Sequence, residues 1–281
     1  MTIRITILCE NTVGTSFSAL GEHGFAAFIE TKTGNYLFDT GQGYSILHNA
    51  KSLKTDLTSI KGMLLSHGHY DHTGGIRKVL KLTNHVVIRA HPSVFSKKYA
   101  SLKTNGKETK RYIGIKFKKE YLEKQGARIL FNSSFSEIGE GIYLTGEVPR
   151  VTDFEKEDPR LLIKKNGEFL PDPLIDDQSL VLKTSMGLII VLGCAHSGLI
   201  NTLKHITGHL KGETIHAVMG GTHLGFLKED QLDATISELK RYDFKHLGAS
   251  HCTGLKAAAR LYQEFNKQFF FANVGTSLSI D

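Results

Sequence analysis

The stretch of sequence that decides the fold reads Leu64-Leu65-Ser66-His67-Gly68-His69-Tyr70-Asp71-His72-Thr73-Gly74-Gly75. It places four potential metal ligands close together, directly after an apolar run and before a helical pattern. In an extended turn His67 and His69 project to the same side, and the chain must then bend for Asp71 and His72 to face a second point. The glycines of the loop supply the backbone freedom for that bend. Imidazoles with one carboxylate predict a site for Zn, Fe, Mn or Ni rather than for Ca, which prefers oxygen ligands.

An aspartate ends an earlier strand pattern, Tyr36-Leu37-Phe38-Asp39-Thr40-Gly41. Taken alone, Asp39 fits an ordinary turn cap. Beside a histidine loop it has a second role, because a carboxylate that accepts the free N–H of a ligating histidine fixes the tautomer of that ring. We therefore expect Asp39 to support the metal ligands.

These two motifs together resemble the metallo-β-lactamase superfamily, whose signature is HxHxDH. The resemblance extends over nearly the whole chain, because Gly193-Cys194-Ala195-His196-Ser197-Gly198 and Gly248-Ala249-Ser250-His251-Cys252 follow strand patterns where the superfamily places its other ligands. It implies that the metal is bound by His67, His69, Asp71, His72, His196 and His251. It also implies one or two divalent ions, with Zn favoured and Mn, Fe or Mg as alternatives. We expect Asp71 to be the catalytic residue as well, by orienting or deprotonating a water molecule.

Three longer phrases resemble one group within the superfamily: residues 192–202, Met219-Gly220-Gly221-Thr222-His223-Leu224, and Ala249-Ser250-His251-Cys252-Thr253-Gly254. That group comprises the 7,8-dihydropterin-6-yl-methyl-4-(β-D-ribofuranosyl)aminobenzene 5′-phosphate synthases and their bacterial relatives. The resemblance implies an enzyme that acts on a phosphorylated, diphosphate-bearing, pterin-like small molecule. Such an enzyme is a transferase that displaces diphosphate. Hydrolysis of a phosphoester is the alternative reaction.

The chain departs from the superfamily pattern at two motifs. Where the superfamily usually has an isolated histidine, this chain has Thr145-Gly146-Glu147-Val148-Pro149-Arg150, so Glu147 is a candidate ligand or substrate contact as well as a plain turn carboxylate. Where the superfamily usually has an aspartate that bridges two metals, this chain has Cys194 and His196. We expect Cys194 to pack beneath the site, with coordination as a thiolate as the alternative. The missing carboxylate leaves one ion and two ions both open.

His223 follows two glycines and an apolar run at residues 214–218. Glycines let backbone N–H groups approach a phosphate closely. We therefore interpret His223 as a substrate contact or as a support for the ligands, rather than as a ligand. The histidines without such a context are predicted to be surface or packing residues: His23, His48, His85, His91, His205, His209, His216 and His246.

Strand and helix patterns alternate along the chain. Strand patterns lie at residues 3–8, 25–30, 36–38, 62–65, 86–89, 141–145, 180–183, 188–192, 214–218 and 244–247, and helical patterns at 45–52, 75–81, 198–209, 229–241 and 255–265. Early hairpins followed by strand–helix units predict a four-layer αββα sandwich of the α/β class. Because the chain has 5 prolines and no flexible tether or internal repeat, we expect one domain over residues 1–281.

The net charge of +7 is concentrated in one segment. Residues 97–128 contain eleven Lys or Arg and three Glu, so this segment carries +8 and the rest of the chain sums to −1. The stretch from about 97 to 125 interrupts the alternation of strands and helices, and we expect an inserted, partly helical lid. Charge runs usually face water. The more specific hypothesis is that these basic residues lie over the site and attract an anionic, phosphorylated small-molecule substrate. Nucleic acid is disfavoured, because few aromatic residues interleave and no binding module is recognisable.

Composition excludes several other classes. With 22% charged and 40% hydrophobic residues, the chain is neither disordered nor fibrous. Its 3 cysteines lie far apart, which excludes a disulfide framework and a CxxC metal knuckle. No apolar run approaches the roughly 18 to 20 residues of a membrane span, and the first residues fit a strand rather than a signal peptide. We therefore expect a cytoplasmic protein without a membrane partner, and the sequence favours no particular oligomeric state.

Two functions from other classes stay open. An RNA-processing nuclease or RNA-binding protein would use the basic segment, but the chain lacks the bridging aspartate and the long insertion of the tRNA-end-processing ribonucleases. A non-catalytic sensor of a metal or of a phosphorylated metabolite would be consistent with the missing bridging carboxylate.

Overall fold

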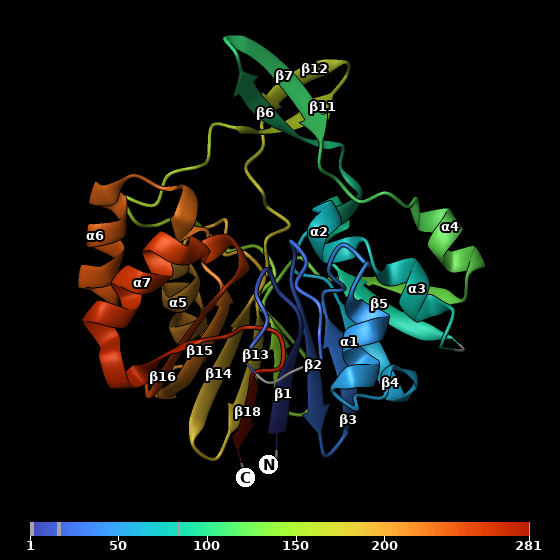
Figure 1. Cartoon of the computed structure of the whole chain (residues 1–281), viewed down its shortest axis with the longest axis horizontal. Coiled ribbons are helices and arrows are strands. Elements are labelled where there is room, and N and C mark those ends of the chain that lie inside the picture. Colours follow the sequence, from blue (N-terminus) through green and yellow to red (C-terminus); the bar gives the residue numbers. More distant parts are fainter. Residues whose placement is uncertain (1–2, 16–17, 84, 281) are drawn as a thin grey trace.

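Two seven-stranded sheets pack face to face and helices cover the outer face of each (Figure 1). The computed structural model describes residues 3–15, 18–83 and 85–280. The first sheet contains, in spatial order, β18 (Ser277–Ile280), β1 (Ile3–Cys9), β2 (Ala26–Thr31), β3 (Gly34–Phe38), β4 (Ile60–Leu64), β5 (Val86–Ala90) and β8 (Ala127–Phe131). The second contains β17 (Phe269–Phe271), β16 (His246–Ser250), β15 (Ile215–Gly221), β14 (Gly187–Leu192), β13 (Leu180–Thr184), β10 (Ile142–Leu144) and β9 (Ser136–Gly139).

The core between the two sheets is formed by alternate side chains of their strands. In β14, Ile189 and Val191 pack in the layer between the sheets, where they join Ile5 of β1. Leu188 and Ile190 of the same strand pack in the layer beneath the helices. Successive residues of a strand point to opposite faces, so a strand buried on both faces is apolar throughout. All five side chains are fully buried, and each contributes roughly 2 kcal/mol to folding by its burial.

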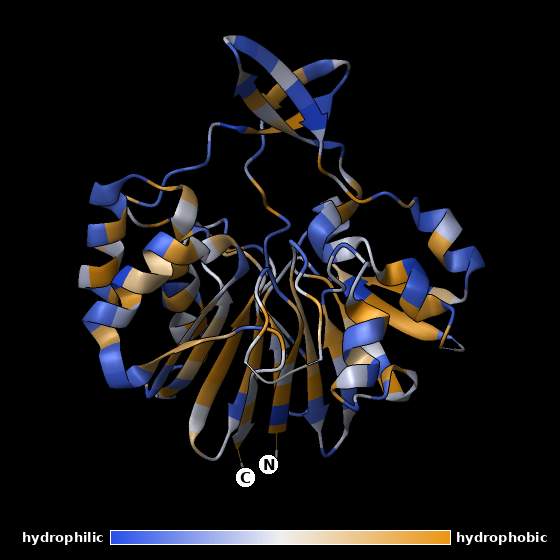
Figure 2. Cartoon of the chain, in the orientation of Figure 1, coloured by the Kyte–Doolittle hydropathy of each residue, from blue (hydrophilic) through white to orange (hydrophobic). Residues whose placement is uncertain are grey.

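Helices form the two outer layers of the sandwich. The first sheet is covered by α1 (Ile46–Ser52) and α3 (Ile76–Leu80), and the second by α5 (Leu199–His209), α6 (Glu229–Leu239) and α7 (Gly254–Phe265). The hydropathy colouring shows apolar strands at the centre and polar residues on the helices outside (Figure 2). This arrangement confirms the four-layer αββα sandwich predicted from the sequence.

A third, smaller sheet stands apart from the sandwich, at the top of Figure 1. Its four antiparallel strands are β12 (Glu168–Pro171), β11 (Leu161–Lys165), β6 (Lys98–Thr104) and β7 (Lys107–Tyr112). The partly helical lid predicted for residues 97–125 is therefore mainly a β-hairpin, followed by the short helix α4 (Lys119–Lys124). All six residues of β7 are exposed, so no alternation of apolar residues marks this strand in the sequence.

Short elements complete the chain. They are the helix α2 (Tyr70–Thr73) and the 3₁₀ helices η1 (Leu57–Ser59), η2 (Pro92–Phe95), η3 (Leu224–Phe226), η4 (His251–Thr253) and η5 (Asn266–Gln268). The strand predicted at 244–247 begins two residues later, at His246. The apolar pattern that predicted the earlier start includes Phe244, which is buried although it lies in the loop before β16. None of the helices in the described part of the chain has the length and apolarity that a membrane crossing requires.

Candidate metal centre

The predicted site residues meet where parallel strands end. Strands β3 and β4 run parallel in the first sheet, as do β14, β15 and β16 in the second. The carboxyl ends of parallel strands lie at the same edge of a sheet, which is where α/β folds place their sites. The residues that follow these five strands are Asp39, His67, His196, His223 and His251. Two sheet edges thus supply one site from five distant parts of the sequence.

Three histidines form a first group of potential ligands. His67, His69 and His196 are buried, and their closest ring nitrogens lie within 4.8 Å of one another. His67 Nε2 is 2.9 Å from His69 Nδ1 and 3.3 Å from His196 Nε2. These residues come from the loop after β4 and the loop after β14, so the group joins the two sheets.

A second group adjoins the first and contains Asp71, His72 and His251. Asp71 Oδ2 is 3.3 Å from His251 Nε2 and 3.8 Å from His72 Nε2, and the two Nε2 atoms are 3.3 Å apart. The rings of His67 and His72 also touch, with centroids 4.2 Å apart. The two groups therefore share one cluster.

The spacing and chemistry of these atoms fit a transition metal. Nitrogen ligands about 2.0–2.1 Å from a tetrahedral Zn²⁺ lie about 3.3 Å from one another, which is close to the separations found here. The nitrogens that face one another are His67 Nε2, His69 Nδ1 and His196 Nε2, and the other ring nitrogens of His69 and His196 are buried without a hydrogen-bond partner in the described structure. Burial lowers the pKa of His67, His69 and His196 well below the usual histidine value. These rings are therefore neutral at pH 7, the state that binds a metal.

Asp39 holds part of the cluster in place from below. Its Oδ1 accepts a hydrogen bond from the Ser66 backbone N–H at 2.8 Å, and its Oδ2 accepts one from the Ser66 hydroxyl at 2.6 Å. His72 Nδ1 lies 2.7 Å from the same Oδ2, so the ring donates there and directs Nε2 to the cluster. His251 is fixed in the same way, because its Nδ1 donates to Asn11 Oδ1 at 2.9 Å. The support that the sequence predicts for Asp39 matches this geometry.

In the second group, the negative charge of Asp71 and the positive charge of His72 stabilise each other. Burial disfavours a charge on His72, but the nearby carboxylates of Asp39 and Asp71 outweigh this effect and raise its pKa to about 9. Burial likewise opposes ionisation of Asp71, but His72, His23 and His251 hold its pKa well below the usual carboxyl value. Asp71 is therefore a carboxylate at pH 7, which suits either a ligand or the orientation of a water molecule.

Cys194 lies among the ligand groups rather than beneath them. Its Sγ is 3.2 Å from His72 Nε2, and it is close enough to share an ion with His67 and His72 or with His251 and Cys252. The residue also lines the cavity above the cluster. Burial raises the pKa of the Cys194 thiol well above its usual value, so the metal-free protein holds a neutral thiol there, and the position is compatible with both the packing role and coordination of an ion.

Unusual backbone conformations gather around the cluster. Asp39, Ala195, His223 and His251 all have positive φ angles, of 59°, 51°, 56° and 51°. Such angles cost non-glycine residues on the order of 1 kcal/mol or more, and they persist where the surrounding structure enforces them, often at functional sites. At Gly68 the constraint is lack of space. A Cβ there would lie 2.1 Å from the Val94 carbonyl oxygen, so any larger residue would force the backbone to shift.

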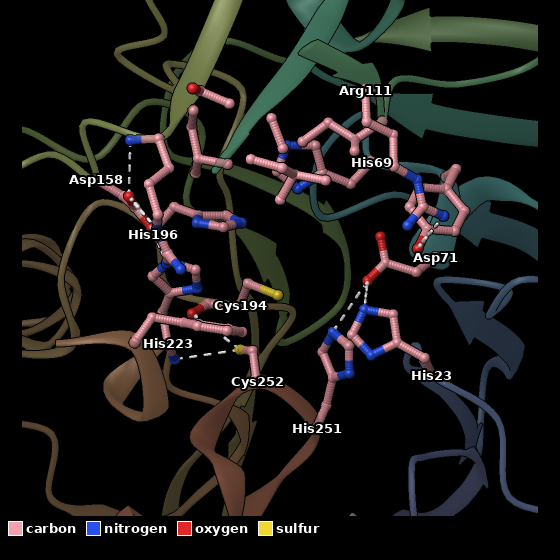
Figure 3. A pocket seen from close by; sticks show the side chains of 18 residues that line it. His23, His69, Asp71, Arg111, Asp158, Cys194, His196, His223, His251 and Cys252 are labelled. Atoms are coloured by element: carbon pink, nitrogen blue, oxygen red, sulfur yellow. Dashed lines mark hydrogen bonds and ion pairs between the residues drawn. The ribbon is translucent and has the colours of Figure 1, made fainter. Parts of the chain in front are cut away.

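The cluster forms the floor of a cavity of about 370 Å³ (Figure 3). Asp71, Cys194, His196 and His251 face it from below. Its roof is the small sheet, which is fastened to the histidine loop: the Tyr70 N–H donates to the Ile113 carbonyl at 2.8 Å. A second attachment runs through three buried charges. Lys98 Nζ donates to Asp172 at 2.9 Å and to Asp176 at 2.7 Å, and Asp176 Oδ2 accepts the N–H of Gly68 at 2.8 Å.

His223 lies on the wall of this cavity, next to His196, with ring centroids 4.3 Å apart. Its Nε2 donates to Asp158 Oδ2 at 3.2 Å, and Asp158 also pairs with Arg160. Burial opposes a charge on His223, but the bonds to Asp158 and Cys252 raise its pKa to about 9. This position of His223, on the cavity wall beside His196, suits its predicted role as a substrate contact or as a support for the metal ligands.

The raised pKa of His223 predicts a pH dependence of stability in the metal-free protein. A raised folded-state pKa stabilises the fold fully below the ordinary histidine pKa of about 6.5, and this contribution is lost as the pH rises towards 9. His223→Asn keeps a residue that tolerates positive φ but removes the titration. The difference in unfolding free energy between wild type and variant should shrink between about pH 6.5 and 9, by at most about 3 kcal/mol. Urea titrations of chelator-treated protein measure it, and a difference that stays constant contradicts the assignment.

Glu147 is the one predicted site residue that the structure places elsewhere. Its side chain is half exposed and bonds to His91 Nε2 at 3.0 Å, away from the residues that line the cavity. The chain turns at Gly146, where φ is 62°. A neighbour in the same turn, Arg150, reaches the site instead, and its Nη2 donates to the His196 carbonyl at 2.8 Å. The sequence did not show which side chain of the turn faces inward.

Several site residues carry no signal in the sequence. His23, predicted to be a surface or packing residue, lies 3.1 Å from Asp71 Oδ2 and lines the cavity. Asp158 and Arg160 reach the cavity from the connection between the second sheet and β11. Each of them stands alone in a loop, so only the fold reveals its place.

The comparisons with known proteins agree with this geometry. Residues 20–178 match the family model of the metallo-β-lactamase superfamily. The chain is 35% identical to an uncharacterized protein of Methanocaldococcus jannaschii, over 98% of this chain and 100% of the relative. It is 33% identical to the 7,8-dihydropterin-6-methyl-4-(β-D-ribofuranosyl)-aminobenzene-5′-phosphate synthase of the same organism, over 95% of this chain and 93% of that protein.

A solved structure supports the same assignment. Tm1679, described as a metal-dependent hydrolase of the β-lactamase superfamily, matches with a TM-score of 0.83 at 27% identity, over 99% of both chains. The fold and the HxHxDH loop thus agree with the family model and with relatives that span almost the whole chain. The chain therefore belongs to the metallo-β-lactamase superfamily.

Proposed function

We propose that this protein is a metal-dependent enzyme that acts on a phosphorylated, diphosphate-bearing, pterin-like small molecule. The observation that carries the proposal is the pair of adjoining ligand groups at the floor of a cavity large enough for a small molecule. The name of the 33% identical relative, a dihydropterin-related phosphate synthase, supports the choice of substrate. The basic residues of β6 and β7 support an anionic one.

The ligand groups define what the chain would hold. His67, His69 and His196 would bind one divalent ion, and Asp71, His72 and His251 a second, with Cys194 between them. Zn²⁺ suits this mixture of imidazole, carboxylate and thiolate. Such an ion, when bound, supplies a Lewis acid for a phosphate oxygen and lowers the pKa of a water molecule.

The protein's own residues have separate tasks in this proposal. Asp71 is ionised and faces the cavity, so it can accept or orient the proton of an attacking group. Asp39 fixes the ring of His72, and Asn11 fixes that of His251. The small sheet contributes Ala100, Arg111 and Leu161 to the lining of the cavity, where they can contact a bound substrate.

Transfer and hydrolysis differ in the attacking group. In a transfer, an amine attacks the carbon that carries the diphosphate, the carbon–oxygen bond breaks, and diphosphate leaves with the electron pair. In hydrolysis, water attacks and the phosphate ester is cleaved. We favour transfer, because the named relative is a synthase.

A turnover assay tests the proposal. Protein loaded with Zn²⁺ or Mn²⁺ is mixed with hydroxymethyl-dihydropterin diphosphate and ribofuranosyl-aminobenzene phosphate, and the products are identified by mass spectrometry. We expect the coupled product and free diphosphate, or the hydrolysed pterin if the enzyme is a hydrolase, and neither with His67→Ala. Metal-loaded protein that binds the diphosphate without converting it would contradict an enzymatic role and favour a sensor.

A further inference from the structure

One face of the small sheet forms the roof of the cavity. Antiparallel pairing places Ala100 of β6 opposite both Arg111 of β7 and Leu161 of β11. Directly paired residues point to the same face of a sheet, and all three of these line the cavity. The roof thus combines a small and a large apolar side chain with one guanidinium group.

The opposite face of the sheet carries different cations. Lys110 precedes Arg111 and points the other way, where its Nζ lies 4.5 Å from the centre of the Phe169 ring. Lys164 stacks on the same ring at 5.0 Å. The pleat therefore separates two adjacent cations, and only Arg111 of the pair reaches the cavity.

Arg111 and Lys116 converge on Tyr70, a residue of the histidine loop. The Arg111 guanidinium lies 5.4 Å from the centre of the Tyr70 ring, and Lys116 Nζ lies 5.5 Å from it. Arg111 Nη2 also donates to the Tyr70 hydroxyl at 3.5 Å. Figure 3 shows Arg111 at the same side of the cavity as Asp71. Within the described residues, neither cation has a carboxylate within ion-pair distance.

Arg160, a third cation near the cavity, does have a carboxylate partner. Arg160 pairs with Asp158, through Nε–Oδ1 at 2.9 Å and Nη2–Oδ2 at 2.5 Å, and stacks on Phe226 at 4.7 Å. Arg160 therefore has a carboxylate partner, which it shares with His223. Arg111 and Lys116, beside Tyr70, have no carboxylate partner among the described residues; Arg111 lines the cavity, and Lys116 is exposed next to it.

We propose that Arg111 and Lys116 bind a second anionic group of the substrate, apart from the group that the metal centre receives. The apolar face of Ala100 and Leu161 lies over the part of the molecule between the two groups. The substrate class is then a compact aromatic or apolar molecule with an anionic group at each end. This inference rests on the proposed function, because it assigns one end of the substrate to the metal centre.

A comparison of two simple ligands tests the inference. Phenyl phosphate has one anionic group, and 4-carboxyphenyl phosphate has a second at the far end of the ring. With Zn²⁺-loaded protein in calorimetry, we expect the second ligand to bind about fivefold more tightly at low salt, the size expected for partly exposed ion pairs. Added salt should reduce the difference, since it screens exposed charges.

Variants assign the effect to the two cations. In the double variant Arg111→Ala and Lys116→Ala, both ligands should bind as phenyl phosphate binds to the wild type. Arg111→Lys should keep part of the difference, because it keeps the charge. Lys110→Ala, the matched control on the opposite face, should keep all of it.

The outcomes separate this inference from the proposed function. If phenyl phosphate binds but the carboxylate adds nothing, or if the double variant keeps the fivefold difference, the second anionic subsite is wrong and the metal centre is unaffected. If the Zn²⁺-loaded protein binds neither ligand, the inference is wrong, and the turnover assay with hydroxymethyl-dihydropterin diphosphate decides the proposed function separately.

Discussion

Replacing His69 with alanine is expected to remove bound metal from the first ligand group and to lower turnover about a thousandfold, since the ion supplies several kcal/mol of transition-state stabilisation. His69 Nδ1 faces the other ligands, 2.9 Å from His67 Nε2, and its Nε2 makes no hydrogen bond within the described residues, so the variant loses a ligand and no other hydrogen bond of that ring. Metal content per chain is measured by elemental analysis after dialysis. Turnover is measured on the same samples.

The control for His69 is another histidine that lies outside the site. His48 is exposed on α1, far in sequence from the ligands, and its Nε2 lies 3.3 Å from the Ser18 carbonyl, so His48→Ala should keep the full metal content. Circular dichroism should show the same fold for both variants. Metal content of His69→Ala equal to that of the wild type would disprove the assignment of His69 as a ligand.

Replacing Asp39 with alanine should have the largest effect on stability. The fully buried carboxylate accepts three hydrogen bonds, two from Ser66 and one from His72. Its loss leaves a buried ring and a buried N–H unpaired, and alanine is strained at a φ of 59°. We expect the free energy of unfolding to fall by about 3–5 kcal/mol and metal affinity to fall about 10- to 100-fold.

Asparagine at the same position separates the two effects. Asp39→Asn tolerates the positive φ and keeps one acceptor for Ser66, but its neutral amide holds the His72 ring less well. Its loss of unfolding free energy should be smaller than that of Asp39→Ala, while its metal affinity is still reduced. Urea unfolding of metal-free protein and competition with a chromophoric chelator give the two quantities. An alanine variant as stable as the wild type would contradict the role of Asp39.

The sequence predicts the sandwich because its strands are apolar on both faces. Runs such as Leu188–Leu192 have no polar side, and such strands occur between two covered faces. The small sheet is missed for the opposite reason. The exposed β7 has no apolar periodicity, and its pairing with β6 and β11 depends on contacts far apart in the sequence. Local patterns carry no information about such pairing.

The site was predictable where a motif encodes it and not elsewhere. The HxHxDH loop and the two later histidines follow strands, and the structure brings their side chains together. The place of His23 beside the cavity was missed, and the alternatives for Glu147 stayed open, because a lone histidine or glutamate in a loop does not reveal which way it points. Cys194 is buried as predicted, and its Sγ lies 3.2 Å from His72 Nε2, so packing and coordination remain the two alternatives for it.

The most direct test of the metal centre is anomalous scattering from crystals of protein purified without added metal, recorded on both sides of the absorption edge. We predict a peak among the ring nitrogens of His67, His69 and His196, and a second among Asp71, His72 and His251 if two ions bind. If neither position shows a peak, even after the crystals are soaked in Zn²⁺, these side chains do not form a metal centre.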